Sequence, residues 1–228
     1  MESINHKTKK NKILFVVVLF VIVALIVSTI YIRDRRKKNA ETRLAEECSQ
    51  VLNEYSSLSD EAEILMQQGK YVEAIRSYMR GINVLKTNEF TLLWCIDRQS
   101  LLPTQLFYGY YNHYQRLSLC HYLLSHAILN AKTNPFYLNH AIREVNNAIS
   151  DIDTYIRTIE EPFFYEKFEK LNFGEIEKEK RKELYKNLLD SYTYLAEKKK
   201  SDLLESKKLL ESMGPIQQTL LAEYKLLS

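Results

Sequence analysis

The stretch LSDEAEILMQQGKYVEAIRSYMRGINVL, residues 58–85, decides the fold of this chain. Its apolar residues recur at steps of three and four on both sides of Gly69, which is typical of two amphipathic helices joined by a turn. Ser57 and Ser59 precede a run of acidic residues and predict a helix N-terminus. The stretch therefore predicts a helical hairpin whose small residues let the two helices approach closely.

The same period of three to four residues extends through most of the chain, and no segment favours a strand. Glycine and proline are scarce, at five and four residues, which favours an all-α fold. The spacing predicts further helices over residues 105–131, 138–159, 184–195, 201–213 and 216–227. The predicted breaks are an irregular segment at 87–104, a turn at Asn134-Pro135, a connector after Pro162, a cap at Ser201-Asp202 and a stop at Gly214-Pro215.

A second decisive stretch lies upstream, at residues 13–32: ILFVVVLFVIVALIVSTIYI, with no charged residue. A helix of this length spans roughly 30 Å, the thickness of the hydrocarbon core of a bilayer. The run is too long for a signal peptide and no A-x-A cleavage pattern follows it. It predicts an uncleaved transmembrane helix. An apolar stripe from Leu44 to Tyr55 is compatible with continuation of that helix beyond the membrane.

Basic residues flank this apolar run on both sides, as expected at two membrane interfaces. The residues predicted to lie at the interfaces are Lys9, Lys10, Lys12, Arg33, Arg35, Arg36, Lys37 and Lys38. Four basic residues precede the run and six follow it closely, so the positive-inside rule weakly favours a cytoplasmic C-terminal region. The opposite topology stays open.

The net charge of +3 conceals two regions of opposite sign. Residues 1–38 carry nine basic and two acidic side chains, whereas the remaining 190 carry 23 basic and 27 acidic ones. The larger region is long enough for one ordinary core and is mildly acidic, which disfavours nucleic acid as a partner. Cys48, Cys95 and Cys120 are odd in number and lack a C-x-x-C pair, so they are interpreted as buried thiols, which weakly fits a reducing compartment.

The hairpin at 58–86 resembles a tetratricopeptide repeat. The positions that carry the resemblance are Leu58, Ala62, Leu65, Gly69, Tyr71, Ala74, Tyr78 and Gly81, with a weaker match at Ala141, Val145 and Ala148. Glu61 and Lys86 depart from the pattern. The resemblance implies stacked antiparallel helix pairs and a protein-binding role. The string G-x-Y-x-E-A-I-x-x-Y also resembles the three-helix microtubule-interacting and trafficking domain.

No catalytic or metal-binding motif stands out. His113, Cys120, His121 and His126 lie on one predicted helix without the H-x-x-x-H spacing of a metal site, so helical-face histidines are favoured. No phosphate loop or nucleophile motif is present, and we expect no enzymatic activity, cofactor or metal. Tyr108, Tyr111 and Tyr114 could line a partner groove or form a packing layer between helices.

We therefore expect a single-pass membrane protein with a basic tail (1–12), a transmembrane helix (13–32), a juxtamembrane segment with a linker helix (33–57) and an α-helical domain (58–228). Within the domain we expect a repeat at 58–86, a weaker helix pair at 105–160 and C-terminal helices at 176–227. The expected function is protein–protein interaction at the membrane, as a scaffold, adaptor or chaperone-like accessory. The alternatives are a self-associating structural protein, as a homo-oligomer, or a trafficking-type three-helix interaction domain.

Overall fold

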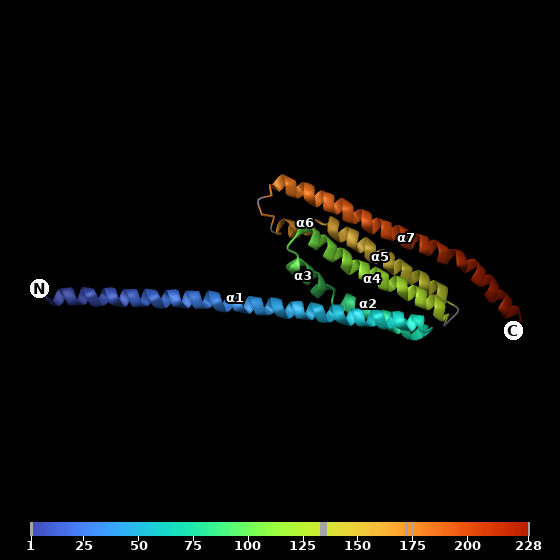
Figure 1. The fold of residues 1–228 in the computed structure, drawn as a ribbon, viewed down its shortest axis with the longest axis horizontal. Helices are drawn as coiled ribbons and strands as arrows, with labels where there is room; N and C mark the ends of the chain where they lie inside the picture. The colour runs from blue at the N-terminus through green and yellow to red at the C-terminus, as the bar shows by residue number, and fades with distance from the viewer. Residues whose placement is uncertain (1, 133–135, 172, 175, 228) are drawn as a thin grey trace. The chain divides into compact units, whose positions relative to one another are not determined.

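The computed structural model describes the backbone of residues 2–132, 136–171, 173–174 and 176–227, and the side chains of residues 25–214 within those ranges. The described residues are helical without a strand, which confirms the all-α class (Figure 1). The helices are α1 (Glu2–Gln67), α2 (Tyr71–Thr87), α3 (Glu89–Gln99), α4 (Pro103–Ala131), α5 (Tyr137–Glu160), α6 (Pro162–Glu169) and α7 (Lys178–Leu227). The predicted turn at Asn134-Pro135 lies outside the described residues.

The chain divides into two compact units, Met1–Glu47 and Cys48–Ser228. The first unit lies within α1, and its described side chains are almost all exposed. The second unit contains the last turns of α1 and every other helix. Its boundary falls at Cys48 rather than at the predicted residue 58, because Cys48 and Tyr55 are already buried in the second unit's core.

The last turns of α1 and the whole of α2 form the predicted hairpin. Gly69 ends α1 with a positive φ of 73°, a conformation that costs glycine little. Ser77 Oγ donates a 2.9 Å hydrogen bond to Glu61 Oε2 across the pair. The predicted helix start at Ser57 and Ser59 is wrong: α1 runs through both. The apolar stripe from Cys48 to Leu65 stays on the face that packs in the core, and this packing overrides the local capping preference.

Helix α4 is the centre of the second unit, because α2, α3, α5 and α7 all pack against it. The α4–α5 interface is the most extensive among the helix pairs in the described part of the chain, and helix α7 packs against both α5 and α4. The interior is rich in aromatic rings: Phe107 of α4 lies 5.0 Å from Phe164 and 5.5 Å from Tyr192 between ring centroids. Burial of each such side chain stabilises the fold by about 1.5–3 kcal/mol.

The segment 87–104 is more ordered than predicted, because it contains α3. This short helix is fixed at its buried face by a disulfide between Cys95 and Cys48 of α1. The interpretation of all three cysteines as free thiols is therefore wrong for two of them, and only Cys120 is a buried thiol. The sequence motif search failed here because a disulfide between residues far apart leaves no local spacing signal.

Helix α5 ends at Glu160, close to the predicted end at residue 159, but three other predicted irregular features are absent. Pro162 does not begin an irregular connector: it occupies the first turn of α6, where a proline ring is well tolerated. Helix α7 continues through Ser201 and through Gly214-Pro215, so the predicted cap and stop are wrong. Leu203 and Leu210 of α7 are buried in the core, and this packing outweighs the local helix-breaking signals.

Candidate functional site

A groove lies over α4, between α2 on one side and α5 on the other, with Glu54 and Leu58 of α1 at its edge. Its volume is about 870 Å³, within the range of ligand-binding clefts. Buried side chains of α4, His121 and Leu124, form the floor. Exposed side chains form the rim. The apolar lining is Leu58, Met79, Ile82, Val84, Leu124 and Ile128.

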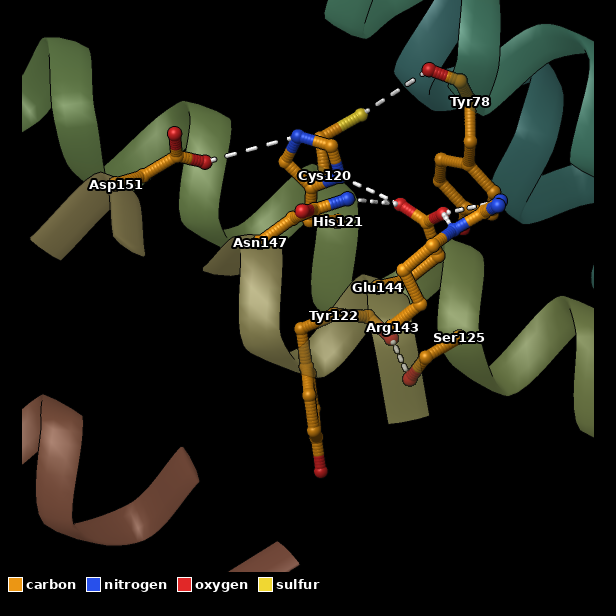
Figure 2. Close-up of polar contacts among 9 residues, drawn as sticks. All are labelled: Tyr78, Cys120, His121, Tyr122, Ser125, Arg143, Glu144, Asn147 and Asp151. Atoms are coloured by element: carbon orange, nitrogen blue, oxygen red, sulfur yellow. Dashed lines mark hydrogen bonds and ion pairs between the residues drawn. The ribbon is translucent and has the colours of Figure 1, made fainter. Parts of the chain in front are cut away.

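The polar part of the floor is a network centred on Glu144 of α5 (Figure 2). Glu144 Oε2 lies 2.8 Å from His121 Nδ1 and accepts a 3.0 Å hydrogen bond from Asn147 Nδ2. Glu144 Oε1 accepts two hydrogen bonds from the guanidinium of Arg143, at 3.0 and 3.1 Å. The carboxylate is therefore buried but fully partnered, which is the condition for holding a charge inside a protein.

These contacts set the charge of the floor. Burial alone would raise the pKa of Glu144, but the hydrogen bonds from His121, Asn147 and Arg143 outweigh it and lower the pKa to about 2. Asp151 differs, because burial raises its pKa and its Oδ2 accepts no hydrogen bond among the described residues. That oxygen lies 3.7 Å from His121 Nε2. His121 therefore lies between Glu144, whose pKa is lowered, and Asp151, whose pKa is raised.

The rim carries mostly positive charge. Arg80 and Lys86 of α2 are exposed, and neither lies in a salt bridge with the described part of the chain, although the charge of Lys86 acts on the carboxyl groups of Glu89 and Asp151. Arg143 of α5 stands on the opposite wall, exposed but bound to Glu144. Glu54 of α1 is the exposed acid of this lining. The groove therefore combines apolar lining residues and a buried, partnered carboxylate with two exposed cations on the α2 wall.

The sequence-based search for sites missed this network. Glu144 lies in the buried stripe of Ala141, Val145 and Ala148. A charged residue within an apolar stripe was the sequence feature that could have indicated this network. His121 and His113 were expected to be ordinary helical-face histidines, but both are buried beside carboxylates, and His113 Nε2 lies 3.8 Å from Glu89. No cluster of three potential metal ligands occurs within the part of the chain that the structure describes.

The repeat-like residues lie where close helix packing needs them. Ala62, Ala74, Ala141, Val145 and Ala148 are fully buried. A side chain added at Gly81 would contact Cys120 and Tyr55 at 3.6 Å. Tyr78 is also buried, whereas Leu58, Leu65 and Tyr71 are half-buried and Gly69 forms the turn. Ala62, Ala74 and Tyr78 belong to the main core cluster, whereas Ala141 and Val145 pack in a second cluster with Leu138 and Leu210.

The three tyrosines that could form either a partner groove or a packing layer divide between the interior and the surface. Tyr114 is buried, and Tyr111 packs edge-on against Tyr155 and Tyr192. Tyr108 is exposed. The structure therefore assigns two of them to the packing layer between helices, and the groove lies farther along α4, on the side that faces α2.

The predicted membrane span falls mostly outside the described side chains, which begin at residue 25. Over the residues that were described, no helix is both long and apolar enough to cross a bilayer. Of the predicted interface residues, Lys9, Lys10 and Lys12 lie outside the described side chains. Arg33, Arg35, Arg36, Lys37 and Lys38 are exposed.

Comparison with known proteins gives no relative: no protein-family model, curated protein or solved structure matches this chain.

Proposed function

We propose that this protein is a membrane-anchored protein–protein interaction module, acting as a scaffold, adaptor or chaperone-like accessory. The observation that carries the proposal is the groove over α4, open to solvent and walled by α2 and α5. It exposes apolar side chains such as Met79 beside cations, the combination found at sites that receive a partner. The tetratricopeptide-like hairpin at 58–86 supports the same role by resemblance, and the apolar run at 13–32 supports the anchor.

We further propose that the second unit works in an oxidising compartment. Disulfides persist in secreted, lumenal and periplasmic regions and are rare in the cytosol. The Cys48–Cys95 bond is buried at both ends and therefore shielded from soluble reductants. This favours the topology opposite to the one weakly preferred by the basic flanks. Protease protection of a C-terminal tag in sealed membrane vesicles with the cytosolic face outward tests it: protection is expected, and cleavage would contradict it.

The interaction role is tested by photocrosslinking in native membranes. A benzoylphenylalanine placed at Met79 of the full-length chain should yield a discrete adduct with a second protein. The same probe at Leu209, an equally exposed apolar residue of α7 outside the groove, is the matched control. An adduct of the chain with itself would support the self-associating alternative. No adduct at Met79 above the Leu209 control would contradict the proposal.

A further inference from the structure

The groove over α4 has a length and an apolar pattern that suit a helix. Its wall on α2 runs from Met79 to Lys86, which corresponds to about 10 Å or two helical turns. Apolar residues stand four apart on α4, at Leu124 and Ile128, and three apart on α2, at Met79 and Ile82. Side chains at these intervals form the ridges between which a third helix can pack.

A peptide bound in an extended conformation would find few backbone hydrogen-bond partners in this groove. The walls are helices whose backbone groups are already bonded internally, and no strand edge exists in the described ranges to accept another strand. Recognition in this groove must therefore come from side chains. An amphipathic helix that lays its apolar face on Leu124 and Met79 satisfies its own backbone hydrogen bonds and needs none from the walls.

The charges on the rim indicate the charge of the segment that binds in the groove. Arg80 and Lys86 are six residues apart, so their backbones are separated by about 9 Å along α2. Arg143 lies on the other wall. One small anionic group cannot reach cations spread over this distance, but carboxylates spaced by one or two turns of a helix can. The single exposed acid of the lining, Glu54, leaves the rim positive.

We propose that the groove over α4 binds a short acidic amphipathic helix of a partner protein. Leucine-like side chains of that helix pack on the apolar lining residues of the groove, and its flanking carboxylates pair with Arg80 and Lys86. This inference rests on the proposed interaction function and names the chemistry of the partner. Rim charges act chiefly on specificity and association rate, so changing their sign should change which helix is selected.

The test uses the full-length chain in non-ionic detergent and fluorescein-labelled peptides of about four helical turns. The first peptide has leucines at i, i+3 and i+7 with glutamates beside them, and the second has lysines in place of the glutamates. A third keeps the composition of the first but contains a central proline that breaks the helix. Fluorescence anisotropy gives the affinities. The glutamate peptide should bind at least about tenfold more tightly than either of the others.

Charge exchange locates the site. Arg80→Glu with Lys86→Glu should weaken the glutamate peptide about tenfold and strengthen the lysine peptide. The matched control is Lys198→Glu with Lys208→Glu, two exposed lysines of α7, which should change neither. The proposal would be overturned by equal binding of the two charged peptides, by binding of the proline peptide as tight as or tighter than that of the glutamate peptide, by no binding of any peptide, or by no effect of the α2 variant. A Met79 photoadduct obtained alongside such a result would leave the interaction function standing.

Discussion

Helix α3 and the α4–α5 pair are held in the same compact unit by different means. The α4–α5 pair buries many apolar side chains along its length, with the His121–Glu144 contact among them. Helix α3 buries only Leu92 and Cys95 fully and exposes Phe90 at its start. Besides this small apolar contact it is fixed by point contacts: the disulfide to Cys48, a close approach to Gly109, a polar link through Asp97 and the contact of Glu89 with His113.

This difference predicts that α3 can unfold locally while the α4–α5 pair stays folded. A long apolar interface loses little when one contact is removed, whereas a short helix held by a small apolar contact and a few point contacts depends more on each of them. We therefore expect α3 to respond strongly to changes at its point contacts and the α4–α5 pair to remain folded. The following predictions test this contrast in order of decreasing effect.

The disulfide should have the largest effect. The bonded cysteines are 47 residues apart in sequence, and closing a loop of that length stabilises a protein by about 4 kcal/mol in the chain-entropy model. Cys48→Ser with Cys95→Ser should lower the free energy of unfolding by this amount, measured by urea denaturation of the full-length chain in detergent. Cys120→Ala leaves the disulfide intact and should cost only the packing of one buried sulfur, so it sets the scale for removing a cysteine side chain from the core. An unchanged unfolding midpoint would show that α3 does not need the bond.

The buried carboxylate of the α4–α5 pair comes next. The pKa of Glu144 is lowered to about 2 in the folded protein, so its stabilising contribution is complete above the unfolded pKa of about 4.5 and is lost as the pH falls toward 2. Glu144→Gln should cost about 3 kcal/mol at neutral pH and flatten the stability profile in this acidic range. Glu205→Gln, an exposed change on α7, is the control. An unaltered acidic limb in Glu144→Gln would contradict the assignment.

Gly109 should have a smaller effect, confined to α3. A side chain there would place its Cβ 2.5 Å from Ile96 Cγ2, so α3 must move away. Gly109→Ala should cost about 1–2 kcal/mol despite the better helix propensity of alanine. Gly81→Ala, whose new Cβ would make ordinary 3.6 Å contacts, should be neutral or stabilising. Adding Ile96→Ala should recover part of the loss, and failure of that rescue would place the strain elsewhere.

The polar link of α3 should have the smallest effect. Lys167 Nζ of α6 lies 2.7 Å from Asp97 Oδ2, and Tyr110 Oη donates a 2.9 Å hydrogen bond to Asp97 Oδ1. Because Lys167 and Asp97 are partly exposed, we expect a coupling of about 1 kcal/mol in a double-mutant cycle of Asp97→Asn and Lys167→Met. Urea denaturation of the four proteins measures it. A coupling near zero would remove this link from the contacts that hold α3.

The same contrast explains what could be predicted from the sequence. The long helices α2, α4 and α5 follow a strong apolar period, so their existence and the turn at Gly69 were predictable. Helix α3 was missed because its position depends on contacts with Cys48 and Gly109, which local spacing does not encode. The helix breaks expected at Ser57 and Gly214 were wrong because burial of neighbouring side chains outweighed local preference.

The groove was not predictable for a related reason. Its cations, Arg80 and Lys86, look like ordinary solvated residues in the sequence, and only the packing of α2 and α5 on α4 brings them to one rim. The aromatic residues Tyr111 and Tyr114 gave a stronger local signal but belong to the interior. The way the helices pack on one another determines which face of α4 stays open. The apolar period of a single helix does not show which other helices pack against it.

The most direct test of this account is hydrogen exchange of the full-length chain in detergent, followed by mass spectrometry before and after reduction of the Cys48–Cys95 disulfide. Amides of α3, residues 89–99, should lose most of their protection on reduction, while those of α4 and α5 keep theirs. Protection of α3 that survives reduction, or simultaneous loss of protection in α4 and α5, would contradict the claim that one region is held by point contacts and the other by its apolar interface.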